Sequence, residues 1–317
     1  MAAAQVTAGR AVEAVRCRIL RPQRSSLPEL LRRQVLSPAS CGDGRNHAVP
    51  GVIQGSGSAA CLNRLQIGKI MLELNGRVCL VTGASGVLGA AICEELVREG
   101  AWVFGVYQHN IERMQALVAE TAELPGTLIP VACDLTCAED TSRMLVTLAA
   151  DSRPIHALVC CAGKMLRKSA LLSNQLDGDP LFELNVEATI RLVRQVVRPM
   201  LGQRAGRVVL LGSLAGESGM PGQSLYAASK AALHGYARSL AFEVGGFGIT
   251  VNVVAPGAVA GPPTHYSAAE EQQVCQRIGL RRLGRPEEVA AVVGFLASAR
   301  ASYINGAVIA VDGGGRF

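Results

Sequence analysis

Short apolar runs alternate with longer amphipathic stretches from residue 77 to residue 311. The runs are rich in Val, Leu and Ile and are bounded by glycine or polar residues, which is typical of buried strands. We expect strands at 77–82, 101–107, 127–133, 156–161, 207–211, 249–254 and 307–311. Between them the apolar spacing is helical, and we expect helices up to Glu99 and at 110–121, 138–150, 180–200, about 226–245 and 286–297.

This alternation predicts a single parallel sheet with helices on both faces, because parallel strands need crossover connections. Right-handed crossovers make it a doubly wound, Rossmann-type α/β domain with seven parallel strands. We assign residues 71–317 to this domain.

The first seventy residues differ from the rest in charge and composition. Residues 1–70 contain ten Lys or Arg and three Asp or Glu, a net charge of +7, whereas the remainder is nearly neutral. Such a segment cannot bury much apolar surface, so we expect a poorly ordered, dispensable extension. It is either a transit peptide or an extension upstream of a start at Met71. The protein would then be cytoplasmic, or located in the mitochondrial matrix if residues 1–70 are a transit peptide.

Composition also argues against several classes of partner. The formal charge of +6 is concentrated in residues 1–70, so a nucleic-acid groove in the body is not favoured. No apolar run is long enough to predict a membrane span. The ten cysteines show no zinc-type spacing, which favours buried free thiols and no metal site.

The first predicted strand leads into a glycine-rich turn, TGASGVLG at 82–89. Gly83 would permit the tight turn, Gly86 would let the backbone approach a phosphate, and Gly89 would let the next helix pack closely. The helix start supplies N–H donors to the phosphates. A dinucleotide site is therefore expected here, with Ser85, Val87 and Leu88 in the same turn.

A tyrosine and a lysine, Tyr226 and Lys230, lie four residues apart at the start of an Ala-rich helix. Together with the glycine turn, Asn185, Ser213 and Pro256-Gly257, they resemble the short-chain dehydrogenase/reductase family. The resemblance covers 71–317, and within the family it is closest to the 3-oxoacyl-(acyl-carrier-protein) reductases.

Three positions depart from the family pattern. Val87 stands where the middle glycine of the turn is usual. Cys160-Cys161-Ala162-Gly163 stands in place of Asn-Asn-Ala-Gly. Gly261 replaces a threonine that is expected to contact the nicotinamide, and Thr264 could stand in for it.

The resemblance implies a catalytic group of Asn185, Ser213, Tyr226 and Lys230. Tyrosine has an ordinary pKa of about 10, and an ammonium one helical turn away is expected to lower it. Lys230 would also hold the nicotinamide ribose, and Ser213 would bind the substrate oxygen. Asn185 would hold a water that links Lys230 to solvent.

The residues after the second strand favour NADP(H) over NAD(H), because no acid is present to bind the ribose 2′-hydroxyl. Tyr107 lies near the acid position, and His109 and Arg113 are the candidate partners of a 2′-phosphate. The resemblance adds further cofactor contacts at Asp134, Leu135, Cys161, Ala162, Gly163, Pro256, Gly257 and Val259.

The expected substrate is a 3-oxoacyl thioester on an acyl carrier protein. Arg204 lies where such reductases often have a basic residue, but Phe247 occupies another position that is often Arg. The alternative is a free small ketone, steroid, sugar or secondary alcohol. A non-catalytic dinucleotide sensor is disfavoured because Tyr226 and Lys230 are both present. The polar segment from Ala258 to Arg282 is expected to be a substrate lid.

The resemblance also implies a homo-oligomer, a tetramer or a dimer. The predicted helix at 180–200 and the helix that carries Tyr226 would form its interface.

Overall fold

The computed structural model describes residues 73–149, 153–261 and 266–315. The chain divides into two units, Met1–Leu65 and Gln66–Phe317, and all described residues belong to the second. The predicted extension at 1–70, the boundary at Met71 and the possible stand-in Thr264 lie outside the described residues.

The described residues form one seven-stranded parallel sheet in the order β3-β2-β1-β4-β5-β6-β7, which confirms the predicted fold. The direction of chain progression reverses between β1 and β4, and the crevice at such a point is where open α/β sheets bind ligands. The strands are β1 (Val78–Thr82), β2 (Trp102–Tyr107), β3 (Thr127–Ala132), β4 (Ile155–Cys160), β5 (Gly206–Leu211), β6 (Ile249–Pro256) and β7 (Val308–Val311).

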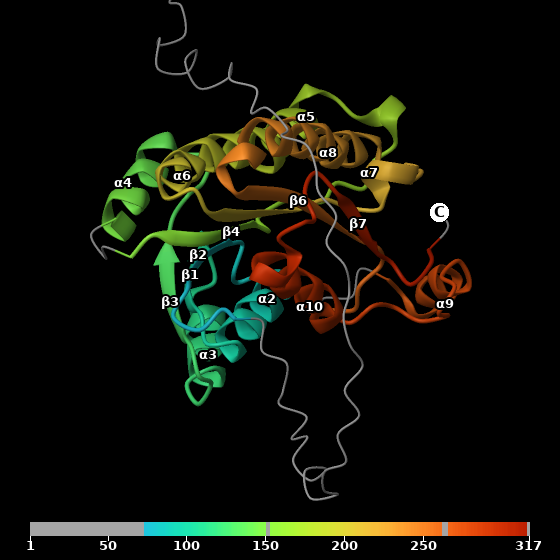
Figure 1. Cartoon of the computed structure of the whole chain (residues 1–317). Coiled ribbons are helices and arrows are strands. Elements are labelled where there is room, and N and C mark those ends of the chain that lie inside the picture. Colours follow the sequence, from blue (N-terminus) through green and yellow to red (C-terminus); the bar gives the residue numbers. More distant parts are fainter. Residues whose placement is uncertain (1–72, 150–152, 262–265, 316–317) are drawn as a thin grey trace, which may run out of the picture. The chain divides into compact units, whose positions relative to one another are not determined.

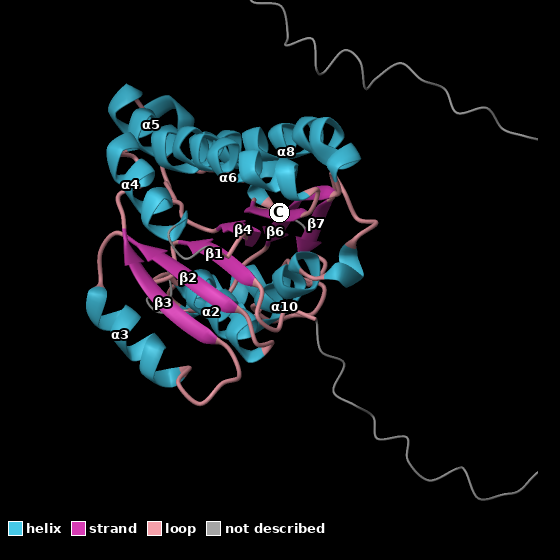
Figure 2. Ribbon diagram, turned by 60° about the vertical axis from the view of Figure 1, so that its left-hand side comes forward, coloured by secondary structure: helices cyan, strands magenta, loops and turns pink. Residues whose placement is uncertain are grey.

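Helices cover both faces of the sheet (Figures 1 and 2). One layer contains α2 (Val87–Arg98), α3 (Ile111–Glu120) and α10 (Pro286–Ala297). The other contains α4 (Ala138–Ala149), α6 (Thr189–Gln203) and α8 (Ser224–Val244). Shorter elements are η1 (Ala170–Leu172), α7 (Ala215–Ser218), η3 (Gly245–Phe247) and η4 (Ala299–Ala301).

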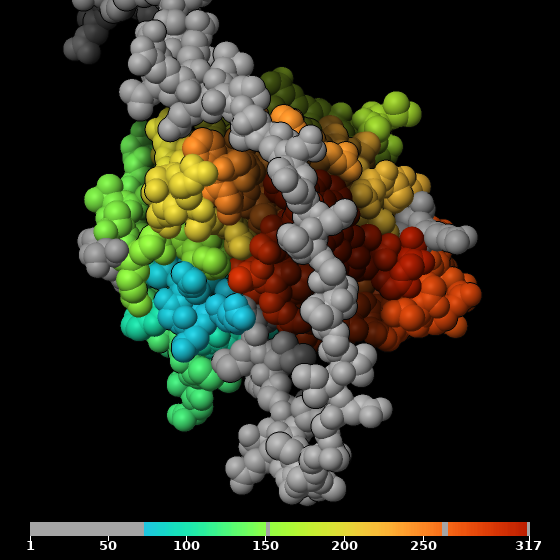
Figure 3. All heavy atoms as spheres, in the orientation of Figure 1, coloured from blue at the N-terminus to red at the C-terminus, as the bar shows by residue number. Residues whose placement is uncertain are grey.

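Strand β1 shows why the apolar runs are continuous. Its side chains alternate between the two faces of the sheet. Cys79 and Val81 pack in the core beneath α2 and α10, whereas Val78 and Leu80 pack in the core beneath α6 and α8. Helices α2 and α10 contact each other although they are far apart in sequence. In Figure 3 the blue atoms at the start of the described chain likewise adjoin red atoms from near its C-terminal end.

The helix predicted at 180–200 is divided in the structure. It consists of α5 (Gln175–Phe182), a π-helical segment η2 (Glu183–Ala188) and α6. Helix α5 begins earlier than predicted because Asn174 and Asp177 form a reciprocal capping box. The π turn carries Asn185, and such turns are frequent at functional sites.

The segment predicted as a polar lid also contains a helix, α9 (Ala268–Gln276). Ser267 caps it by accepting a hydrogen bond from the backbone N–H of Glu270, whose side chain bonds back to the Ser267 N–H. Helix α9 buries none of its residues, which explains why no apolar pattern predicted it.

Candidate active site

A cavity of about 600 Å³ opens where β1, β4, β5 and β6 end. No Asp or Glu is among its described lining residues, whereas Lys164, Lys230 and His109 are. This charge pattern suits an anionic ligand. The predicted site residues that line the cavity are Gly83, Ser85, Gly86, Val87, Leu88, Gly89, Tyr107, Leu135, Cys161, Ala162, Gly163, Ser213, Tyr226, Lys230, Pro256, Gly257 and Val259. Asn185 and Asp134 are not among them.

The glycine turn has the geometry expected of a phosphate cradle. Gly83 has a φ of +70°, and a Cβ there would lie 2.8 Å from the backbone of Ala162. A Cβ at Gly89 would lie 2.0 Å from the Gly83 carbonyl oxygen, so only glycine fits. The first turn of α2 contains no acidic side chain, which leaves the positive end of the helix dipole uncompensated at the cavity.

Two departures from the family pattern lie against each other. A Cβ at Gly261 would lie 2.7 Å from Cγ1 of Val87, well inside ordinary contact distance. The valine side chain therefore occupies the space that a side chain at position 261 would need. The larger residue at position 87 and the smaller one at position 261 therefore compensate each other in volume.

The segment after β4 is held by backbone groups rather than by the asparagines usual in the family. The backbone N–H groups of Cys161 and Ala162 both donate to the hydroxyl of Thr82, each at 3.1 Å. This pair of bonds joins the ends of β1 and β4 across the crevice. The cysteines thus preserve the local support, because it does not depend on their side chains.

Asn185 lies behind the cavity wall and is 1% exposed. Its side-chain oxygen accepts from the Lys164 N–H at 2.8 Å, and its amide donates to the Lys164 carbonyl and to the Ser229 hydroxyl, each at 3.0 Å. A Cβ at Gly163 would lie 3.0 Å from Oδ1 of Asn185 and 3.2 Å from Nζ of Lys230. Asn185 therefore anchors the segment beside Lys230, and its predicted role in a water relay stays a prediction.

Lys230 is buried, and its ammonium donates to the carbonyl oxygen of Leu211 at 2.8 Å. Burial lowers its pKa from 10.5 to about 8, although the neighbouring thiols of Cys161 and Cys160 act in the opposite direction. The charged form is the one that burial disfavours.

The pKa of Tyr226 is raised, which is opposite to the predicted lowering. The lysine nitrogen lies 6.0 Å from the centroid of the tyrosine ring. Burial raises the pKa of Tyr226, and a hydrogen bond with Ser213 opposes this only in part. The cost of removing a phenolate from water exceeds the stabilisation that the Ser213 hydrogen bond gives it. The phenol therefore stays protonated at neutral pH.

Of the two residues predicted to bind a 2′-phosphate, His109 and Arg113, only His109 lines the cavity. His109 lines it together with Tyr107 and Gln108. Arg113 does not, because its guanidinium pairs with Glu120 at 2.9 Å on the same helix.

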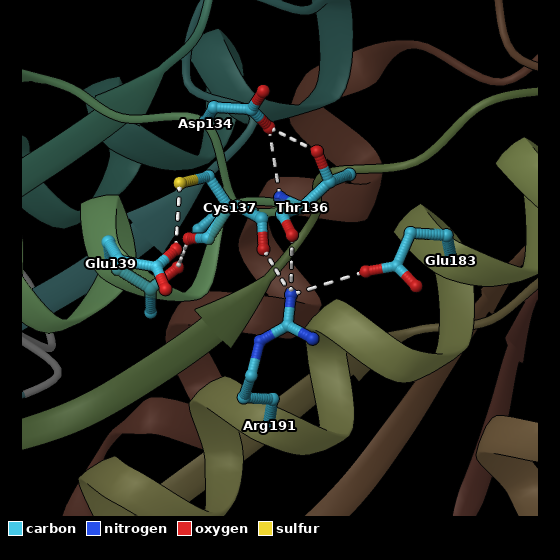
Figure 4. Close-up of polar contacts among 8 residues, drawn as sticks. Asp134, Thr136, Cys137, Glu139, Glu183 and Arg191 are labelled. Atoms are coloured by element: carbon cyan, nitrogen blue, oxygen red, sulfur yellow. Dashed lines mark hydrogen bonds and ion pairs between the residues drawn. The ribbon is translucent and has the colours of Figure 1, made fainter. Parts of the chain in front are cut away.

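Asp134 belongs to the turn after β3 (Figure 4). Its carboxylate accepts from the backbone N–H and the hydroxyl of Thr136, at 2.9 and 2.6 Å, and these bonds together with a Gln108 contact lower its pKa. Its side chain thus orders the turn that presents Leu135 to the cavity. The predicted adenine contact of Asp134 stays a prediction.

Arg191 is a site-ordering residue that the sequence analysis missed. From α6 it donates to the carbonyl oxygens of Leu135 and Thr136, at 2.7 and 3.2 Å, and to a carboxylate oxygen of Glu183 at 3.3 Å (Figure 4). It ties the turn after β3 to the π-helical segment. Nothing in the local sequence distinguishes it from a solvated helix arginine.

A group of mainly apolar lining residues was also missed, because they come from separate segments of the chain. They are Met165, Leu184, Leu214, Met220, Tyr266 and Leu283. The guanidinium of Arg167 lies 4.7 Å from the centroid of the Tyr266 ring, so the segment after β4 contacts the segment before α9.

Arg204 lies away from the cavity within one chain. It is the C-cap residue of α6, immediately before β5, and so lies at the amino ends of the strands, opposite the cavity. Its guanidinium donates to the Gly246 carbonyl at 3.0 Å and lies 5.5 Å from the ring centroid of Phe247.

The described cysteines are all free thiols. Across residues 73–149, 153–261 and 266–315, no group of three or more His, Cys, Asp or Glu could hold a metal ion. In the same ranges no helix combines the length and apolar character needed to cross a membrane.

Residues 83–315 match the family model described as enoyl-(acyl carrier protein) reductase. The chain belongs to the short-chain dehydrogenase/reductase family. This short-chain reductase is therefore an oxidoreductase, and the match includes the glycine turn, Ser213, Tyr226 and Lys230.

The curated relatives of this short-chain reductase include 3-oxoacyl-[acyl-carrier-protein] reductases. That of Rickettsia bellii is 37% identical over 245 residues, which is 77% of this chain and 98% of the relative. That of Thermotoga maritima is 36% identical over 246 residues, with 77% and 99% covered.

Solved structures show the same architecture. A putative betaketoacyl-ACP reductase is 32% identical with a TM-score of 0.67, covering 76% of this chain and 98% of the other. A putative gluconate dehydrogenase from Agrobacterium tumefaciens is 26% identical with a TM-score of 0.74, covering 78% and 98%.

Proposed function

We propose that the protein is an NADPH-dependent reductase that converts a 3-oxoacyl thioester on an acyl carrier protein to the 3-hydroxyacyl thioester. One observation carries this proposal: Ser213, Tyr226 and Lys230 line the same carboxylate-free cavity as the glycine turn. A proton donor and a dinucleotide cradle thus share one space. The relatives named as 3-oxoacyl reductases support the substrate class.

The residues present fit a nicotinamide dinucleotide. The turn at Gly83, Gly86 and Gly89 would hold the pyrophosphate at the start of α2. His109 would face a 2′-phosphate, and the absence of an acid at Tyr107 spares that phosphate a repulsive charge.

The remaining predicted contacts would line the adenine and nicotinamide ends of the dinucleotide. Among these contacts are Asp134, Leu135, Cys161, Ala162, Gly163, Pro256, Gly257 and Val259.

The chain's own groups would supply the proton and the orientation. When bound, the nicotinamide supplies a hydride to the substrate carbonyl carbon. Tyr226 would donate its phenolic proton to the carbonyl oxygen as negative charge develops there, and its raised pKa keeps that proton in place until then. Ser213 would donate a hydrogen bond to the same oxygen.

Lys230 would contribute a positive charge in the cavity. With a pKa of about 8, it is mostly protonated at neutral pH, and it would bind the ribose and stabilise the phenolate left on Tyr226. Asn185 would keep Lys164 and the adjoining backbone in place.

The apolar part of the cavity lining suits an acyl chain, since it includes Met165, Met220 and Leu214. Two observations favour a free small ketone or sugar as the second candidate. Arg204, at a position where acyl-carrier reductases often have a basic residue, lies within one chain at the amino ends of the strands and so away from the cavity. The likeness to a putative gluconate dehydrogenase points the same way.

The deciding experiment compares acetoacetyl linked to acyl carrier protein with a free acetoacetyl ester of matched concentration, following NADPH oxidation by the full chain. We expect a higher kcat/KM with the carrier-linked substrate. Equal or higher values with the free ketone would favour the second candidate, and no oxidation with either would exclude the proposed reaction.

Tyr226→Phe tests the mechanism within the same assay. It keeps the ring and removes the proton donor, so kcat should fall by about 10²–10⁴-fold while the Kd of NADPH stays within about twofold. Near-normal turnover by this variant would place the proton donor elsewhere.

We further propose a homo-oligomer, a tetramer or dimer, and a cytoplasmic location. Sedimentation at micromolar concentration would test the first, and a monomer alone would contradict it. The relatives named above come from bacteria and lend no support to mitochondrial targeting of residues 1–70.

A further inference from the structure

His234 lies on α8 one helical turn beyond Lys230, and the mechanism above does not use it. The residue is 6% exposed, and its Nε2 atom is buried with no hydrogen-bond partner in the described part of the chain. A buried, unpaired imidazole nitrogen is unfavourable, since it has lost its contact with water. An aliphatic side chain would fill the same helix position without that loss.

The ring is placed against two glycines that flank Ser213. A Cβ at Gly212 would lie 2.7 Å from Nε2 of His234 and 2.7 Å from Cγ1 of Val253. A Cβ at Gly216 would lie 2.9 Å from the backbone nitrogen of Ala231 and 3.2 Å from Cε1 of His234. The edge of the imidazole therefore lies beside both glycines and shares the space next to them with Val253 and the backbone of α8. The backbone that carries Ser213 rests directly on this edge.

Helix α8 holds the same backbone at a second point. Lys230 donates to the carbonyl oxygen of Leu211, in the peptide that leads into Gly212. On its other side the segment is bonded to β6, through Gly212 N–H to Val254 and Leu214 N–H to Pro256, at 2.8 and 3.0 Å. The segment that carries Ser213 is thus bonded to β6 and to Lys230 and also contacts the imidazole of His234.

The ring is held in its neutral form. Burial lowers the pKa of His234, with smaller contributions in the same direction from Arg238 and Lys230, while Glu217 raises it. A neutral ring adds no second buried charge beside Lys230.

We propose that His234 is a positioning residue, which sets the position of Ser213 by filling the space between Gly212 and Gly216. The inference rests on the proposed role of Ser213 at the substrate oxygen. Misplacing a catalytic group by about 1 Å can lower a rate by about 10²-fold. The ring would then act on turnover and not on cofactor affinity.

The test compares His234→Ala, His234→Gln and the control Gly235→Ala. Glutamine keeps a flat polar end at nearly the same reach, and Gly235 is exposed with open space around its Cβ. We expect His234→Ala to lower kcat by tenfold or more with the Kd of NADPH within twofold, and His234→Gln to recover most of the loss. Gly235→Ala should match the wild type. A kcat within twofold of wild type for His234→Ala, or equal losses for Ala and Gln, would overturn the proposal.

Amide hydrogen exchange gives a second readout that needs no turnover. Exchange at Gly212, Leu214 and Gly216 should be faster in His234→Ala than in wild type or Gly235→Ala. Unchanged protection there would also overturn the proposal. If the wild type reduces no oxoacyl thioester, the proposed function fails, and exchange still decides the role of His234. If His234→Ala does not fold, the kcat and exchange of His234→Gln decide: values near wild type support the space-filling role, and a loss of kcat of tenfold or more in the folded variant contradicts it.

Discussion

Replacing Lys230 by methionine is expected to stabilise the protein without ligand while removing its activity. The wild-type ammonium is buried, and burial lowers its pKa from 10.5 to about 8. At neutral pH the folded protein must therefore hold a charge that its surroundings disfavour. Methionine has a similar length and carries no charge, so this cost disappears.

The magnitude follows from the displacement of the pKa. One pKa unit corresponds to about 1.4 kcal/mol, so at pH 7 the buried ammonium costs about 3 kcal/mol. The variant also loses the hydrogen bond from Lys230 to Leu211, which offsets about 1–2 kcal/mol. We expect Lys230→Met to be about 1–2 kcal/mol more stable than wild type at pH 7.

The pH dependence gives the sharper test. Because the folded pKa lies below the unfolded one, the unfolded state binds more protons between pH 8 and 10.5, and wild-type stability rises with pH in that window. The free-energy cost of burying the Lys230 ammonium should therefore fall from about 3 kcal/mol at pH 7 to about 1.5 kcal/mol at pH 9.5. The advantage of the variant should therefore fall by about 2 kcal/mol between pH 7 and pH 9.5.

Urea unfolding of both proteins at the two pH values, at one fixed protein concentration under reducing conditions, measures this difference. Other titrating groups are common to both proteins and cancel. A variant that is less stable at both pH values by the same amount would refute the reasoning, because it would show that the ammonium is not destabilised by burial.

Further substitutions test the cofactor site and the extension. Gly89→Ala places a Cβ 2.0 Å from the Gly83 carbonyl, so it should lower stability by about 1–3 kcal/mol and weaken NADPH binding, whereas Gly202→Ala, with open space around it, should do neither. Tyr107→Asp should lower the ratio of kcat/KM for NADPH over NADH by about tenfold or more through repulsion of the 2′-phosphate, and an unchanged ratio would contradict this assignment. Protein that begins at Met71 should keep its fold and activity, and loss of soluble, active protein would show that residues 1–70 are needed.

The strands and the phosphate turn were predictable because their signals are local. A buried parallel strand needs an uninterrupted apolar run, and the turn needs glycine at Gly83 and Gly89 for steric reasons that the spacing already reveals. The division of the 180–200 helix was not predictable. Asn185 in the π-helical segment bonds to the backbone of Lys164, and that contact exists only after the segment that follows β4 and the helix have come together.

The amino-acid sequence by itself determined the individual strands, the glycine turn and the spacing of Tyr226 and Lys230, since each depends on residues that are close along the chain. Tertiary structure alone decided the electrostatics and the fit of the site. The pKa of Tyr226 rises because burial outweighs its hydrogen bond, and burial is a property of the packed protein. Val87 and Gly261 compensate each other in volume only because folding brings them into contact. Residues so far apart in the sequence give no local signal that they will be neighbours.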